Sequence, residues 1–211
     1  MDLSLRVDPE HFDYLKIQKG NLDRFASDRF DWMVRYQEDL RDQYESIRPH
    51  LPRQCGAFLD VGSGLGGIDV LIRRHYVERG RDPEVNLLDG LDDPPEMKLH
   101  RQTFNNMRIA RNFQVKNGCP PQKLVAYGPQ APEFESKFDL VVSFGSWCFH
   151  YPTELYLARV KQALAPKAVV ILEVRAEKED WLRALVDNFG APVMILKRPK
   201  WSRLVFGNAG A

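Results

Sequence analysis

The chain has 211 residues, of which 44% are hydrophobic and 28% are charged, and its formal net charge is +1. This composition is that of a globular protein long enough to bury a sizeable core. It excludes a protein drawn to nucleic acid or a membrane by its overall charge, and no segment approaches the roughly 18 apolar residues of a membrane span. The three cysteines are scattered and the N-terminus lacks a signal-peptide pattern, so we expect a cytoplasmic protein without a disulfide framework.

Residues 1–50 are predicted to form a helical leader that precedes the main domain, residues 51–211. Its apolar side chains recur at steps of three and four, which is typical of an amphipathic helix. The members of this stripe are Met33, Tyr36, Leu40, Tyr44 and Ile47. Because such a stripe needs a partner surface, we expect the leader to cover a pocket of the main domain.

The most informative segment is the run FLDVGSGLGG over residues 58–67, in which an apolar strand leads into a glycine-rich turn and then a helix. Such a turn lets a ligand approach the backbone and meet the N–H groups at the start of a helix. The carboxylate of Asp60, two residues before the first glycine, would repel a pyrophosphate and attract an ammonium or sulfonium group. The pattern therefore favours S-adenosylmethionine (SAM) over a nicotinamide cofactor.

Strands and helices alternate through the rest of the chain. Strands are predicted over 57–61, 85–88, 123–127, 138–144, 168–174, 193–197 and 203–207. Helices are expected from Pro152 and Thr153 onward, with Leu157, Val160 and Leu164 facing inward, and over 178–188. This alternation predicts an α/β fold with a doubly wound, mostly parallel seven-stranded sheet, an antiparallel C-terminal strand, and a ligand at the carboxyl ends of the strands.

The order of these parts resembles a class I SAM-dependent methyltransferase, from residue 55 to about residue 208. The resemblance is carried by LDVGSGLGG, by Asp89 after the second strand, by FDLVVSFGSWCFHY, and by LARVKQALAPKAVVILEV. Two departures stand out. The turn that is usually Pro-Gly-Gly is Pro166-Lys167-Ala168, and the third strand ends in 126–129, AYGP, which offers no acid or amide to read the adenine.

The resemblance implies that SAM is bound, and S-adenosylhomocysteine released, by residues at the ends of the first, second and fourth strands. These residues are Asp60, Gly62, Ser63, Gly64, Leu65, Gly66, Asp89, Gly90, Phe144 and Gly145. In this family the acid after the second strand binds the ribose hydroxyls. Asp89 is also a turn former in its Asp-Gly pair, and Asp60 can also cap nearby loop amides.

Three other readings of the glycine turn remain open. Gly62, Gly64 and Gly67 also fit the dinucleotide pattern G-x-G-x-x-G, which would make the chain a nicotinamide-dependent oxidoreductase. Asp60 and the lack of a substantial second domain speak against that reading. The turn can also belong to a binding module that holds SAM without transferring a methyl group, or to a structural turn that binds nothing.

His150, just after the fourth strand, is the candidate general base for a hydroxyl acceptor, because an imidazole accepts a proton near neutral pH. The alternative is a histidine packed in the pocket wall. The neighbouring aromatic residues Trp147, Phe149 and Tyr151 either line the acceptor site or pack in the core. We expect a small-molecule or sugar acceptor, methylated on oxygen. The spacing of the five histidines predicts no metal site, and Cys148 is not expected to be a nucleophile.

Two basic segments offer weaker indications of a partner. Residues 91–122 combine a helical apolar pattern with arginines that suit an acidic acceptor, and residues 196–204, LKRPKWSRL, mix cations with a tryptophan. We expect a solvated helix face for the first and a solvated hairpin tip for the second, with no nucleic-acid partner.

Overall fold

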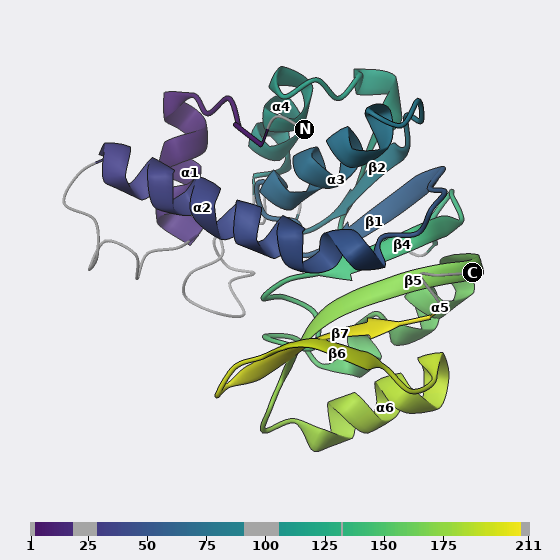
Figure 1. The fold of residues 1–211 in the computed structure, drawn as a ribbon. Coiled ribbons are helices and arrows are strands. Elements are labelled where there is room, and N and C mark those ends of the chain that lie inside the picture. The colour runs from purple at the N-terminus through teal and green to yellow at the C-terminus, as the bar shows by residue number, and fades with distance from the viewer. Residues whose placement is uncertain (1–2, 19–28, 91–105, 132, 208–211) are drawn as a thin grey trace.

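The structure, a computed structural model, describes residues 3–18, 29–90, 106–131 and 133–207. It confirms the predicted α/β fold with one seven-stranded sheet, in the order β3-β2-β1-β4-β5-β7-β6 (Figure 1). The strands are β1 (Ala57–Val61), β2 (Glu84–Leu88), β3 (Leu124–Tyr127), β4 (Phe138–Ser143), β5 (Leu164–Arg175), β6 (Val193–Lys197) and β7 (Trp201–Phe206). The helices are α1 (Pro9–Gln18), α2 (Arg29–Ile47), α3 (Gly67–Val77), α4 (Met107–Lys116), α5 (Leu157–Ala163) and α6 (Glu179–Phe189), with short 3₁₀ turns η2 (Arg48–His50), η4 (Pro121–Lys123) and η5 (Thr153–Leu155).

Strand β1 lies at the centre of the parallel part of the sheet, where Phe58 is in register with Val85 of β2 on one side and Leu140 of β4 on the other. The chain first extends outward from β1 to β3 and then returns to β4. Ligands of open α/β sheets bind at such a reversal, beyond the carboxyl ends of the strands. Strand β7 is antiparallel to both β5 and β6, as the sequence predicts for a closing hairpin.

Helices cover both faces of the sheet, and the alternation of side chains along β1 explains why (Figure 1). Phe58 points into a core shared with α1, α2, α3 and α4, whereas Leu59 and Val61 point into a second core shared with α5 and α6. Because successive side chains of a strand face opposite ways, a strand that is apolar throughout is buried on both faces. All five residues of β1 are buried, Asp60 included.

The predicted stripe of the leader is confirmed on α2. Tyr36, Leu40, Tyr44 and Ile47 are buried, and Met33 is partly buried against the same core. The Tyr44 hydroxyl also hydrogen-bonds Nδ1 of His75 on α3, with 2.8 Å between the two atoms. The leader is thus divided into α1 and α2, and it packs on the face of the sheet that α3 covers.

The prediction was wrong about the segment that leads into β5. The helix after Pro152 is interrupted, as η5 followed by α5, and Leu164 begins β5 instead of ending a helix. Pro166 disfavours a helical conformation at the residue before it, so the chain is already extended there. The expected turn at 166–168 is instead an irregularity inside β5, where Lys167 has a φ of +68° and the register with β4 shifts.

In the part of the chain that the structure describes, no helix is both long enough and apolar enough to span a membrane.

Candidate functional site

The glycine-rich turn after β1 lies over the end of β2. Gly62 N–H donates to the carbonyl oxygen of Leu88 at 2.7 Å, and Gly66 N–H donates to that of Ser63 at 2.8 Å. Gly62 has a φ of +81°, and a Cβ atom at this position would overlap the side chain of Ser146. The conformation and the close approach of the loop after β4 both require glycine here.

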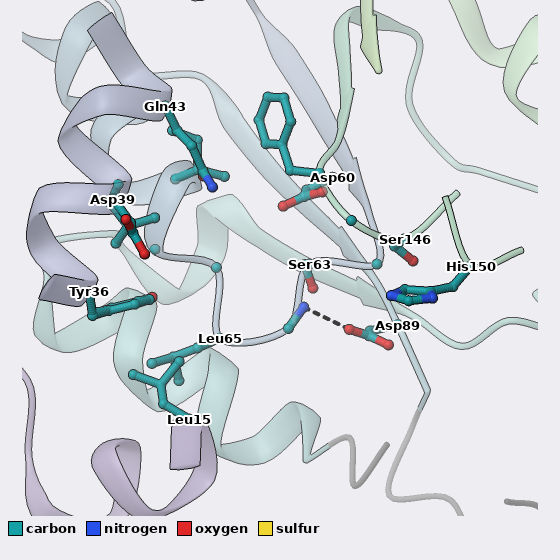
Figure 2. Close-up of a pocket in the computed structure, with 18 of the residues that line it drawn as sticks. Leu15, Tyr36, Asp39, Gln43, Asp60, Ser63, Leu65, Asp89, Ser146 and His150 are labelled. Atoms are coloured by element: carbon teal, nitrogen blue, oxygen red, sulfur yellow. Dashed lines mark hydrogen bonds between the residues drawn. The ribbon is translucent and has the colours of Figure 1, made fainter. Parts of the chain in front are cut away.

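A pocket of about 320 Å³ opens above this turn (Figure 2). Three parts of the chain form its wall: the leader, the glycine turn with the end of β2, and the loop after β4. The lining residues are Leu15, Tyr36, Asp39, Leu40, Gln43, Asp60, Gly62, Ser63, Gly64, Leu65, Gly66, Gly67, Ile68, Asp89, Phe144, Gly145, Ser146, His150 and Tyr151. The volume falls within the range of small-molecule sites in proteins.

Ten of the eleven site residues predicted from the sequence line this pocket, which brings together the ends of three strands. The eleventh, Gly90, lies next to it and donates its N–H to Oδ1 of Asp89 at 2.7 Å. The leader residues Tyr36 and Leu40 reach the same pocket, as expected from the stripe. The sequence did not single out Asp39, Gln43 or Ser146 as pocket residues.

Asp89 follows β2 and holds the glycine turn in place. Its Oδ2 accepts the N–H of Gly64 at 2.6 Å, and its Oδ1 accepts the N–H of Gly90. Asp89 is therefore the turn former that its Asp-Gly pair suggested. A carboxylate can accept about four hydrogen bonds.

Asp60, the fourth residue of β1, carries an ionisable carboxyl group that is only 3% exposed and lines the pocket. Its Oδ1 has no hydrogen-bond partner among the described residues. Burial raises the pKa of this carboxyl well above its usual value, and the neighbouring carboxyls of Asp69 and Asp89 raise it further. A buried carboxyl oxygen that accepts no hydrogen bond is costly, so this position favours a cationic ligand group that pairs with it.

Asp69, in the first turn of α3, lies behind the glycine turn and was missed by the sequence analysis. It is fully buried, and burial raises its pKa to about 8. Gln114 of α4 braces the same region by donating its side-chain N–H to the carbonyl oxygen of Gly66 at 2.6 Å. The sequence did contain one signal for Asp69, because it is the single acid in the run 68–72, IDVLI, whose remaining four residues are apolar and buried.

Helix α2 lies directly against the glycine turn (Figure 2). A Cβ atom at Gly67 would overlap Tyr36 and Leu40 of α2, so the absence of a side chain there admits the helix. Asp39 and Gln43, one and two turns along the helix from Tyr36, point toward the pocket. The leader thus supplies an acid, an amide and a phenol to a site whose other walls belong to the sheet.

The loop after β4 is folded tightly, which divides its aromatic residues between core and pocket. Trp147 is fully buried and donates its indole N–H to the carbonyl oxygen of Thr153 at 2.9 Å. The backbone N–H of His150 donates to the carbonyl oxygen of Ser146 at 2.7 Å. The ring of His150 lies at the pocket, and Tyr151 is also a lining residue (Figure 2). Trp147 therefore belongs to the core and Tyr151 to the pocket wall. Phe149 is half-buried outside both, with the Arg175 guanidinium 5.0 Å from its ring centroid.

An ion pair behind the β4 loop fixes another wall residue. Arg203 of β7 is 3% exposed, and its guanidinium lies 2.5 Å from Oε1 of Glu173 on β5. The same guanidinium donates to Ser46 of α2 and lies over the ring of Phe144, 4.7 Å from its centroid. Sheet, leader and pocket wall are joined at this point.

The basic segment between β2 and β3 is described only in part, because residues 91–105 lie outside the described ranges. In the described part, Lys116 forms an ion pair with Asp8, and Arg108 lies 3.7 Å from Glu10. These α4 cations face the N-terminal segment. The described residues contain no group of three or more His, Cys, Asp or Glu side chains placed to hold a metal ion.

Comparison with known proteins shows a shared fold. No model of a protein family matches the sequence, and no curated protein matches it. The solved structures that match include a methyltransferase from Pyrococcus furiosus, with a TM-score of 0.53, 15% identity, and coverage of 80% of this chain and 82% of that one. The StiE O-MT matches with a TM-score of 0.59 and 10% identity over 92% of this chain and 82% of that one.

A third match is the T. thermophilus 16S rRNA N2 G1207 methyltransferase in complex with AdoMet and guanosine. Its TM-score is 0.53 and its identity 16%, over 81% of this chain and 42% of that one. The StiE O-MT and the rRNA N2 methyltransferase differ in acceptor, so the shared fold leaves the acceptor of this chain to be argued from its own pocket.

Proposed function

We propose that this chain, which has the fold of class I SAM-dependent methyltransferases, transfers a methyl group from SAM to an oxygen of a small-molecule or sugar acceptor. The observation that carries the proposal is the carboxyl of Asp60, which is buried and lines the pocket and whose Oδ1 accepts no hydrogen bond from the described residues. The sulfonium and ammonium groups of SAM are cations that suit such a site. A pyrophosphate would meet this carboxyl and that of Asp89 with like charge.

The residues present fit SAM in three places. Asp60 would pair with the ammonium group of the methionine part, and the backbone of the turn 62–66 leaves room for close approach. The carboxylate of Asp89, at the pocket, would accept hydrogen bonds from the ribose hydroxyls. Strand order supports the same choice, because the antiparallel β7 between β5 and β6 departs from the order 3-2-1-4-5-6 of dinucleotide-binding folds.

The charge of the pocket favours an acceptor without a phosphate or carboxylate group. Asp39, Asp60 and Asp89 line it together with His150, and no Lys or Arg is among its lining residues within the described ranges. An anionic acceptor would therefore find no cationic side chain to pair with among these lining residues. Hydroxyl groups of a sugar or a similar small molecule can instead hydrogen-bond Asp39, Gln43 and Tyr151.

Bound SAM supplies an electrophilic methyl group: the acceptor oxygen forms a bond to the methyl carbon as the carbon–sulfur bond breaks and its electron pair stays on sulfur. The protein's own task is alignment and proton removal. His150 accepts the acceptor's hydroxyl proton on its imidazole. Helix α2 forms one wall of the pocket, with Tyr36, Asp39, Leu40 and Gln43 among the lining residues.

The identity of the cofactor is tested by calorimetry. We expect S-adenosylhomocysteine to bind the purified protein and NAD to give no heat of binding. The carboxyls of Asp60 and Asp89 beside the glycine turn attract a cation and repel a pyrophosphate. The proposal would be overturned if NAD binds and neither SAM nor S-adenosylhomocysteine gives a heat of binding. Binding of SAM without methylation of any compound in a broad metabolite extract would favour the non-catalytic binding module.

Replacing Asp89 with alanine should weaken the binding of S-adenosylhomocysteine by about tenfold or more, since charge-assisted hydrogen bonds contribute about 1.5–3 kcal/mol. The measurement is the dissociation constant, with a thermal melt to show that the variant is folded. Asp187→Ala, on an exposed part of α6, is the matched control and should bind as the wild type does. Unchanged affinity in a folded Asp89→Ala protein would remove this residue from the cofactor site.

A further inference from the structure

Two carboxyl groups, those of Asp60 and Asp69, lie buried together at the glycine turn, and Asp60 lines the pocket. Asp60, on β1, is 3% exposed, and Asp69, in the first turn of α3, is fully buried. The two carboxyls lie within hydrogen-bond reach of each other. Oδ1 of Asp60 and both carboxyl oxygens of Asp69 have no hydrogen-bond partner among the described donors. Buried polar atoms in proteins are normally hydrogen-bonded, so three neighbouring buried oxygens without a donor require an explanation.

The groups around this pair do not neutralise it. From α2, the phenol of Tyr36 has its pKa raised by burial and by the nearby Asp69, so it stays neutral. From the end of β2, Asp89 adds a like charge, and Cys119 beyond α4 is a neutral thiol whose pKa burial raises to about 11. On α3 itself, the guanidinium of Arg73 donates to the carbonyl oxygen of Gly118 and to Asp82, away from the pair.

Two adjacent buried carboxyls cannot both be ionised near neutral pH without a cation between them. We propose that Asp60 and Asp69 share one proton in the ligand-free protein and release it when the ammonium group of the cofactor binds, which makes Asp69 a positioning residue for that group. This inference rests on the proposed function, because it takes the ligand to be SAM or S-adenosylhomocysteine. The exchange balances in charge: one ammonium enters and one proton leaves.

Burial of both groups supports the shared proton, since burial raises the pKa of Asp69 to about 8 and that of Asp60 well above its usual value. Such a pair titrates as a unit. Because binding releases a proton, affinity rises with pH while the free pair still holds that proton, and levels off once the free pair has lost it. The rise can approach tenfold for each pH unit, which corresponds to one proton.

The test is calorimetry of S-adenosylhomocysteine binding at pH 7, in phosphate and in Tris, two buffers with different heats of protonation. The difference in apparent enthalpy counts the protons released, and we expect about one per site. In Asp69→Asn the remaining acid has lost its partner. The released proton count should therefore fall by at least about half, and the pH at which affinity levels off should move down by about one unit or more.

Two controls separate the pair from other sources of protons. 5′-Methylthioadenosine lacks the amino-acid part and should bind wild-type protein without proton release. Asp187→Asn, exposed on α6, should release the same number of protons as the wild type. The wild-type measurement with the two ligands tests the inference even if Asp69→Asn does not fold.

The outcomes keep this inference distinct from the proposed function. If S-adenosylhomocysteine does not bind at all, the proposed function fails. If it binds without releasing a proton, or if Asp69→Asn releases as many protons as the wild type, the shared proton is refuted and the methyltransferase proposal stands.

Discussion

Replacing His150 with alanine should lower the turnover number by about 10²–10⁴-fold and leave the affinity for S-adenosylhomocysteine unchanged. The imidazole lies in the wall of the pocket and is exposed to it, so it can take the proton of an acceptor hydroxyl during methyl transfer. The measurement is the initial rate at saturating SAM, together with calorimetry of the product. His150→Asn retains a hydrogen bond without proton transfer and should be nearly as slow.

The matched control is His50→Ala, because His50 lies in η2 and is not one of the residues that line the pocket. It should keep the wild-type rate. A loss below about threefold in His150→Ala would contradict the role of general base and would point to an amine acceptor, or to catalysis by alignment alone.

Replacing Arg203 with methionine should lower the free energy of unfolding by about 3–5 kcal/mol. The guanidinium is buried against Glu173, and its removal leaves that carboxylate, whose residue is 6% exposed, without a counter-charge. Chemical denaturation followed by circular dichroism measures the change. The substitution also removes the cation that lies over Phe144.

A double variant tests whether the loss of stability comes from the unpaired charge of Glu173 or from altered side-chain packing. Replacing Glu173 and Arg203 together with methionine should recover most of the stability, because an apolar pair of similar volume does not leave a buried charge. Arg183→Met, on an exposed α6 pair whose charged atoms are 3.8 Å apart, should change stability by less than about 0.5 kcal/mol. If Arg203→Met is as mild as Arg183→Met, the buried pair does not stabilise the fold.

The fold was predictable because its signals are local. The alternation of apolar strands with helical patterns gave all seven strands, to within a few residues at their ends except at the start of β5, and the stripe of α2 is directly readable at steps of three and four. The glycine turn and Asp89 follow from strand ends, which meet at one edge of a parallel sheet. The start of β5 was misplaced because its irregularity at Lys167 depends on pairing with β4, which no local pattern records.

The site was predictable only where backbone geometry defines it. Residues that follow strands were found, whereas Asp69 and Asp39 were missed because each lies on a helix whose rotation and docking are set by tertiary packing. Asp69 had one local signal, a charge inside an apolar run. Asp39 had none, since an exposed acid on an amphipathic helix is expected on any solvated face.

The placement of α2 against Gly67 makes one wall of the pocket from a helix that is separate from the sheet and the glycine turn. The turn and the strand ends are constrained by backbone conformation and by the core, so substitutions there endanger folding. Asp39 is exposed and Gln43 only half-buried, and substitutions at such positions cost little stability. Under the proposed function, substitutions on this one helix would change which acceptor binds, while the part of the pocket assigned to SAM stays fixed.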